Sequence, residues 1–127
     1  MSRNYPDRTT FSDSTFNLPT KTWLFSKFYP YFSKELERLG IIEWSEKFDC
    51  EDFAAMYKIL CQVCHKNSRS TQGGLAVGAV DYQKDSGEYH CINIAFTDQG
   101  LVFIEPQTGK ELKLSENEKN SINKLRI

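Results

Sequence analysis

Apolar residues recur at three- and four-residue intervals between residues 19 and 39, the spacing of one face of an amphipathic helix. This pattern predicts a helical segment over 19–39, and Gly40 is a suitable residue to end it. Pro30 lies inside the segment and lacks the N–H that a helix interior needs, so we expect a kink or a break into two helices there. The apolar positions are Trp23, Leu24, Phe28, Tyr31, Phe32, Leu36 and Leu39.

A second stripe with helical spacing follows a short link and predicts a helix over 50–65. Asp49 is a good N-cap, and Asp52 three positions later resembles a capping box with Asp in place of the usual Glu. We expect the two later cysteines of the stripe to be buried, unpaired and free of metal. The stripe consists of Cys50, Phe53, Ala54, Tyr57, Leu60, Cys61 and Cys64.

The second half of the chain changes from helical spacing to short apolar or alternating runs separated by turn residues, which predicts strands. Because the runs are closely spaced, they must pair as antiparallel hairpins or a meander. The order predicts an α+β fold, with N-terminal helices packed on a C-terminal antiparallel sheet, and divides the chain into an N-terminal arm (1–18) and a single domain (19–127). The expected strands cover 75–82, 88–96, 101–105 and 110–114.

Composition narrows the functional classes. The 127 residues carry a net charge of −1, and Lys and Arg are scattered, so we expect no nucleic-acid partner. No apolar run approaches the roughly 20 residues that span a bilayer, and no apolar segment follows the N-terminus, so we expect no membrane partner and a cytoplasmic location. In that compartment the four cysteines are expected to be reduced. The oligomeric state stays open.

Cys50 is a candidate nucleophile because it lies at the start of the second predicted helix. The N–H groups and the macrodipole of a helix N-terminus favour a thiolate, which is the reactive form of cysteine. Glu51 and Asp52 place two negative charges in the same turn and oppose this effect, so residue spacing alone leaves the sign of the pKa shift open. The alternative is that Cys50 is only the first residue of the buried stripe.

The two central strands predict a histidine–carboxylate pair. If Asp98 and Gln99 form a two-residue loop, the numbers of opposed residues sum to 197, and His90 and Glu105 become diagonal neighbours on one face. The other residues of that face are apolar, so we expect a helix to cover it. An imidazole next to a thiol can take its proton, and a carboxylate behind the imidazole fixes its tautomer. If Cys50 joins this pair, its pKa should be lowered.

Three motifs together resemble the papain-like and transglutaminase-like cysteine proteins, including small members, many of them phage-encoded. In that superfamily a helix opens with the nucleophilic Cys, and two antiparallel strands then carry His and an acid. The resemblance covers residues 44–110 and implies the family's fold, with Cys50 as nucleophile, His90 as general base and Glu105 as orienting acid. The motifs are Asp49-Cys50-Glu51-Asp52-Phe53-Ala54, Tyr89-His90-Cys91-Ile92-Asn93 and Ile104-Glu105-Pro106-Gln107-Thr108-Gly109.

The resemblance implies acyl transfer or hydrolysis through a Cys-His-Glu triad, with a peptide or another amide or ester as substrate. A second hypothesis, of a different class, is a non-catalytic binding protein on the same scaffold, such as a phage factor that captures a host protein or a small metabolite. The residues expected to contact a substrate are Trp44, Asp49, Gln72 and Gln107, with Gln72 also considered as an oxyanion donor beside the backbone N–H groups.

Other motifs suggest different chemistry. Cys61-Gln62-Val63-Cys64-His65 matches the haem-attachment string, and with His90 and Cys91 it offers zinc ligands. Haem attachment needs an exported protein, and adjacent residues of one strand point to opposite faces, so we expect neither metal nor cofactor. A redox role for the cysteine pair is weaker because the pair lies mid-helix. The aromatic residues of 23–32 could form a ligand surface, but their helical spacing favours the core.

Overall fold

The computed structural model of the chain describes residues 9–10, 16–66 and 74–126. Its centre is a six-stranded sheet with the strand order β1-β8-β4-β5-β6-β7, and β2 and β3 form a separate parallel pair. The strands are β1 (Thr9–Thr10), β2 (Phe16–Asn17), β3 (Gly74–Leu75), β4 (Val77–Gln83), β5 (Tyr89–Thr97), β6 (Gly100–Glu105), β7 (Lys110–Leu112) and β8 (Lys124–Arg126).

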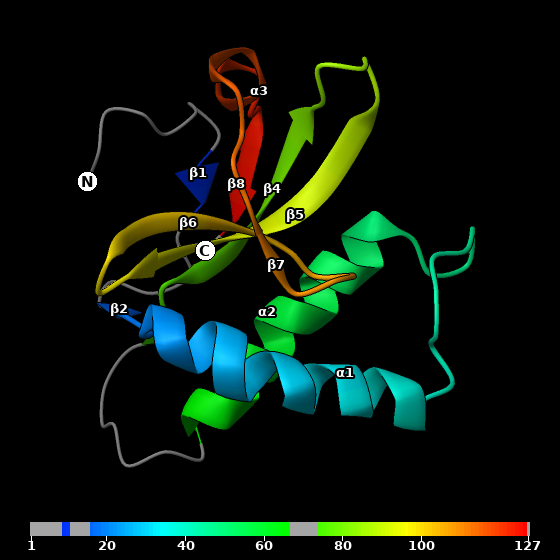
Figure 1. The fold of residues 1–127 in the computed structure, drawn as a ribbon, viewed down its shortest axis with the longest axis vertical. Coiled ribbons are helices and arrows are strands. Elements are labelled where there is room, and N and C mark those ends of the chain that lie inside the picture. Colours follow the sequence, from blue (N-terminus) through cyan, green and yellow to red (C-terminus); the bar gives the residue numbers. More distant parts are fainter. Residues whose placement is uncertain (1–8, 11–15, 67–73, 127) are drawn as a thin grey trace.

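Two long helical segments lie on one side of the sheet, and a short helix lies at its far end (Figure 1). The first segment starts as the π-helix η1 (Trp23–Phe28) and continues directly as α1 (Tyr29–Arg38). Pro30 lies in the first turn of α1, where a missing N–H is tolerated, so the predicted break takes the form of a change in helix type. The other helices are α2 (Cys50–Lys66) and α3 (Glu116–Asn120).

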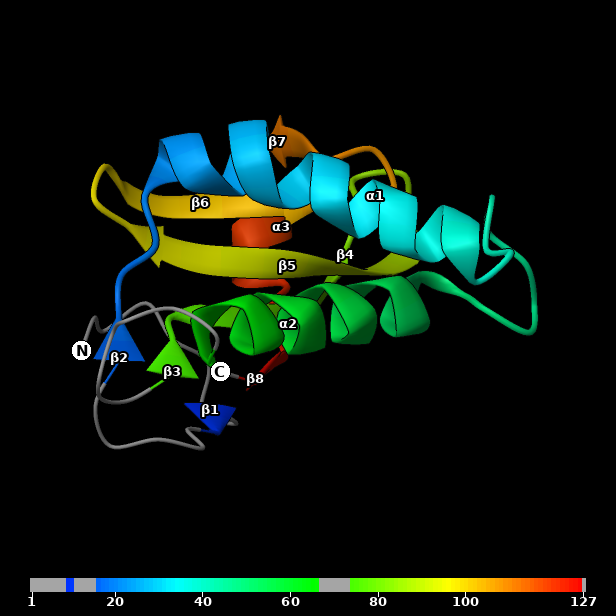
Figure 2. The same ribbon diagram turned by 90° about the horizontal axis from the view of Figure 1, so that it is seen from below.

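The sheet is buried on both faces. On one face, Val77, Ala95 and Ile104 pack with the aromatic residues Phe32 and Tyr57 of the helices. Figure 2 shows α1 running along β6 and β7, and α2 running along β5. The opposite face forms a second cluster without these helices, made of Val80, Tyr82, Ile92, Ile94, Phe103 and Leu125, with Phe96, Leu112, Leu114 and Ile122 packed against it.

The predicted hairpin between β5 and β6 has the expected register, because Phe96 pairs with Leu101 and Thr97 pairs with Gly100. The expectation that a helix covers the His90 face is wrong, since the neighbours of His90 on that face belong to the second cluster. β5 has apolar residues at both parities, so alternation alone does not tell which face the helices cover.

The predicted C-terminal antiparallel sheet needs one correction at its edge. β4, β5, β6 and β7 are antiparallel as expected, but β8 adds to β4, and β1 from the predicted arm pairs parallel with β8. Helices followed by a mainly antiparallel sheet agree with an α+β description. The division into an arm and one domain at residue 18 stays a prediction. Among the described residues, no helix has both the length and the apolar character that a membrane span requires.

Candidate functional site

The start of α2 is fixed by a reciprocal pair of side-chain hydrogen bonds. The N–H of Asp49 donates to Oδ2 of Asp52 over 3.0 Å, and the N–H of Asp52 donates to Oδ1 of Asp49 over 3.4 Å. This is the capping box predicted from the sequence, with Asp in both positions. The cap places Cys50 as the first residue of α2, half-buried where the helix meets the sheet.

The Cys50 sulfur lies against the backbone of β5 at Cys91. Even-numbered residues of β5 hydrogen-bond to β4, as the Phe96 N–H does to the Ala76 oxygen over 2.9 Å, so the Cys91 N–H is directed to the β6 side. The hairpin register would place Pro106 opposite Cys91, just after β6 has ended. The Cys91 N–H instead hydrogen-bonds to the sulfur of Cys50. Cys50 therefore lies beside β5, one residue from His90.

His90 and Glu105 form the predicted pair. Nε2 of His90 lies 2.6 Å from Oε1 of Glu105, and the two side chains are only 11% and 17% exposed. The ring of Tyr82 contacts the imidazole edge-on, with the ring centroids 6.0 Å apart. A carboxylate oxygen at Nε2 favours the tautomer with the proton on Nε2. The Nδ1 atom is then the ring nitrogen that can accept a proton.

The expected activation of Cys50 does not follow from its surroundings. Burial raises the pKa of the Cys50 thiol above its ordinary value, and the negative charges of Asp49 and Glu51 raise the pKa further. The hydrogen bond from the Cys91 N–H lowers it only in part. The prediction of a lowered pKa is therefore wrong, because desolvation of the thiolate outweighs the groups that favour it.

The four expected substrate contacts lie in different surroundings. Trp44 is 52% exposed in the link before α2. Asp49 is engaged in the helix cap, and Gln107 lies in the turn after β6, where its N–H donates to Oε2 of Glu105 over 3.3 Å. Gln72 lies outside the described residues. A role for these side chains in contacting a substrate stays a prediction.

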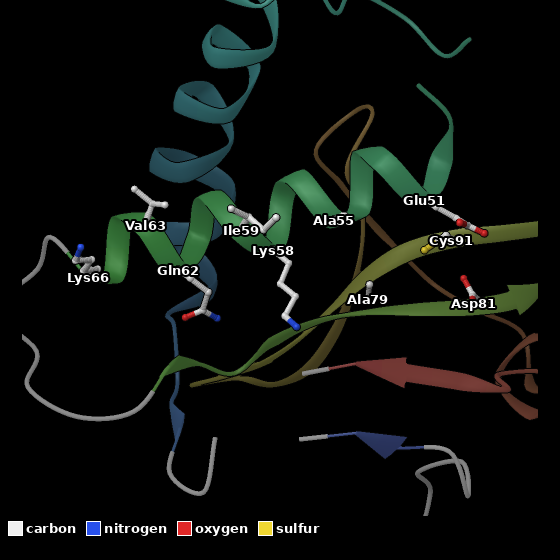
Figure 3. Close-up of a pocket in the computed structure, with 10 residues that line it drawn as sticks. All are labelled: Glu51, Ala55, Lys58, Ile59, Gln62, Val63, Lys66, Ala79, Asp81 and Cys91. Atoms are coloured by element: carbon white, nitrogen blue, oxygen red, sulfur yellow. The ribbon is translucent and has the colours of Figure 1, made fainter. Parts of the chain in front are cut away.

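A groove of about 650 Å³ runs between α2 and the strands β4 and β5 (Figure 3). Gln62 bounds it near β3, because its side chain bonds both the N–H and the C=O of Leu75 at 3.0 Å. Cys91 lies at the other end, near the start of α2, where its thiol hydrogen-bonds to Asp81. The lining residues are Glu51, Ala55, Lys58, Ile59, Gln62, Val63, Lys66, Ala79, Asp81 and Cys91.

Sequence reasoning missed this groove. Its residues come from a helix and two strands, and most of them do not belong to any of the sequence motifs described above. The available signal was the pair of alanines, Ala55 and Ala79, because small side chains on facing elements leave space between them. Cys91 was considered only as a metal ligand, although burial raises its pKa and keeps it a neutral thiol.

The other cysteines and the aromatic residues are mostly part of the core. Cys61 is buried as predicted, but the prediction of a buried Cys64 is wrong, because Cys64 is only half-buried; both are free thiols. Nowhere in the described part of the chain do three or more His, Cys, Asp or Glu side chains gather as a metal would require. Phe28 and Phe32 are core residues, whereas Trp23 and Tyr31 line a shallower groove beside Cys64.

Comparison with known proteins gives structural matches only. No family model and no curated protein matches the chain. The crystal structure of Polyporus squamosus lectin bound to the human-type influenza-binding epitope Neu5Acα2-6Galβ1-4GlcNAc matches with a TM-score of 0.70 and 23% identity, over 94% of this chain and 42% of the lectin chain. A structure described as a PSL1a–E64 complex matches with a TM-score of 0.74 and 23% identity, over 100% and 45%. The chain thus spans less than half of either matched protein.

These matches correct the family assignment made from the sequence. The two structures named above are described as a lectin and as a PSL1a complex. The predicted papain-like and transglutaminase-like fold, and the peptidase and hydrolase hypotheses based on it, are therefore withdrawn. The three motifs are short, and a helix beside an antiparallel hairpin occurs in many folds. Strand parity located the His90–Glu105 pair, whereas the motifs did not determine the family.

Proposed function

We propose that this protein is a non-catalytic binding module whose ligand site is the groove between α2, β4 and β5. The observation that carries the proposal is the composition of the groove. Ala55 and Ala79 leave a volume of about 650 Å³, which lies within the usual range of small-molecule sites. Most of the accessible lining is apolar, and charged side chains of both signs stand around it, so the groove suits a ligand that has an apolar face as well as polar groups.

The ligand class follows from the charges along the groove. Glu51 and Asp81 supply hydrogen-bond acceptors at one end, and Lys58 and Lys66 supply donors along α2. A hydroxyl group both donates and accepts, so a hydroxyl-rich molecule such as a glycan can bond to both kinds of side chain. The structural likeness to a lectin supports the same class. Because the likeness covers less than half of the lectin chain, the class is tested with more than one ligand.

The experiment is a titration of the protein with Neu5Acα2-6Galβ1-4GlcNAc and, separately, with E64, followed by ¹⁵N NMR. We expect the glycan to shift the amide signals of Ala55, Ala79 and Asp81, whereas shifts with E64 alone would contradict a hydroxyl-rich ligand. Ala55→Leu and Ala79→Leu should each weaken that binding by about tenfold or more, because the added side chain occupies the groove; tenfold corresponds to about 1.4 kcal/mol.

Ser33→Leu is the matched control, since it adds the same side chain to an exposed position of α1 outside the groove. It should leave the affinity unchanged. Shifts confined to other parts of the chain, or an Ala55→Leu variant that binds as tightly as the wild type, would contradict the groove as the ligand site.

A second candidate function is thiol chemistry at Cys50, and a specific observation favours it. The sulfur is held by the Cys91 N–H, one residue from the His90–Glu105 pair. In this proposal the Cys50 sulfur bonds to the acyl carbon of an amide or ester, His90 accepts the thiol proton through Nδ1 and passes it to the amine or alcohol that leaves, and Glu105 orients the imidazole; water then releases the acyl group. The raised pKa of Cys50 argues against a standing thiolate, so the proton would have to move during the attack.

Intact-mass measurement separates the two candidates. After incubation with E64, the binding module should keep its mass, whereas a reactive Cys50 should gain the mass of one ligand. That gain should disappear in Cys50→Ala and in His90→Ala. A gain that persists in Cys50→Ala would place the reaction on another cysteine and remove this second candidate.

A further inference from the structure

The turn that follows β6 determines where the Glu105 carboxylate points. The N–H of Thr108 and the N–H of Gly109 donate to the backbone oxygen of Glu105 over 3.3 Å and 2.7 Å. The N–H of Gln107 donates to Oε2 of Glu105 over 3.3 Å, while Oε1 is the atom that meets His90. A shift of this turn would therefore move the carboxylate relative to the imidazole.

Tyr29 holds this turn from the helix side. Its hydroxyl donates to the backbone oxygen of Gln107 over 3.2 Å. Its ring lies against Gly109, so closely that a Cβ at this position would overlap the ring atoms. Gly109 also has a φ of +75°, a conformation that glycine adopts without strain. Tyr29 and Gly109 thus pack closely against each other, although 80 residues separate them in the sequence.

The helix geometry places Tyr29 at this point. Tyr29 is the first residue of α1, directly after the six-residue π-helix η1, where the wider turn changes the direction of the following side chains. Burial raises the pKa of the Tyr29 phenol, and the nearby negative charge of Glu105 raises it further. The phenol is therefore a neutral hydrogen-bond donor close to the carboxylate.

We propose that Tyr29 is a positioning residue for the Glu105–His90 pair, acting through the 105–109 turn. Its hydroxyl and ring fix the turn, the turn fixes the carboxylate, and the carboxylate fixes the proton on Nε2 of His90. This inference concerns the polar pair beside Cys50 and requires neither a ligand in the groove nor a reaction. Its failure can therefore be distinguished from failure of the proposed function.

The test is ¹⁵N NMR of the two histidine side chains, which are the only imidazoles in the chain. In the wild type, the His90 nitrogens should report one tautomer, with the proton on Nε2. In Tyr29→Phe, both signals should shift toward the average of a tautomer mixture, and the Nε2 proton should exchange faster with water. The spectrum of His65 should stay unchanged and serves as an internal control for the fold.

Tyr31→Phe is the matched control, because Tyr31 is 38% exposed two residues further along α1. It should leave the His90 signals in place. Gly109→Ala is a second variant, which perturbs the turn by displacing the Tyr29 ring and by strain at its positive φ, and should shift the His90 signals in the same direction as Tyr29→Phe. If Tyr29→Phe does not fold, the Gly109→Ala spectrum decides in its place. Unchanged His90 signals in the folded variant would overturn the proposal.

Discussion

Asn93 joins α2 to the sheet. Its side chain is completely buried, and Nδ2 donates to the backbone oxygens of Ala54 and Gly78 over 2.9 Å and 3.0 Å. We expect Asn93→Ala to lower the free energy of unfolding by about 3 kcal/mol, because two buried carbonyl groups lose a donor and a cavity forms. Urea denaturation measures this loss.

Asn120→Ala is the control for this prediction, since Asn120 is exposed on α3. It should change stability by less than about 0.5 kcal/mol. If Asn93→Ala costs no more than the control, the two hydrogen bonds do not stabilise the contact between α2 and the sheet. A large loss in both variants would indicate a general sensitivity to asparagine replacement.

Single residues show what could be predicted from the sequence. The Asp49–Asp52 cap and the His90–Glu105 pair were predictable, because helix caps and strand parity depend on positions a few residues apart. The pKa of Cys50 was not, because its main cause is burial by distant parts of the chain. Sequence spacing identifies which groups can meet, whereas the protonation of a group also depends on how much water reaches it.

The short helix α3 depends on its cap. The N–H of Glu118 donates to Oγ of Ser115 over 3.1 Å, and the N–H of Ser115 donates to Oε1 of Glu118 over 3.0 Å. Ser115→Ala removes the cap and a hydrogen bond to Asp85, so we expect a loss of about 1 kcal/mol. Thermal unfolding measures it, with Ser86→Ala in an exposed turn as the control, and equal melting temperatures for both variants would contradict the prediction.

The contribution of this α3 cap to stability depends on pH. Hydrogen bonds from the backbone N–H groups of Ser115 and Asp85 lower the pKa of Glu118 below its ordinary value. A lowered folded-state pKa means that the contribution is present above the unfolded-state value and is lost as the pH falls through the folded-state value. The difference in stability between Glu118→Gln, which cannot ionise, and the wild type should therefore shrink in acid, as thermal unfolding at neutral and at acidic pH would measure.

At the level of elements, the positions of the helices and strands followed from periodicity, but their arrangement did not. β5 is buried on both faces, so the pattern could not tell that α2 packs on the side of Ala95 and not on the side of His90. β8 is a three-residue strand far from its partner β4 in sequence, and no local sequence pattern predicts such a pairing. The groove depends on the same long-range packing.

For the whole molecule, β5 connects the two hydrophobic clusters, because Ile92 and Ile94 belong to one and Ala95 to the other. Leu125 of β8 is 1% exposed and pairs with Val80 in the cluster that lacks the long helices. We expect Leu125→Ala to cost about 2–5 kcal/mol and to destabilise both sides of the sheet together. Urea unfolding followed by tryptophan fluorescence and by far-UV circular dichroism should give coincident transitions.

The fluorescence signal reports the helix side of the sheet, since Trp23 packs against the cluster there and the other tryptophan, Trp44, lies in the link before α2. Leu101→Ala is the control, because Leu101 is 46% exposed, and its cost should stay below about 1 kcal/mol. If the two probes give different urea midpoints in Leu125→Ala, with the fluorescence midpoint unchanged from the wild type, the two clusters unfold independently. A coincident shift would mean that the strands around the His90–Glu105 pair and the groove along α2 unfold together as one cooperative unit.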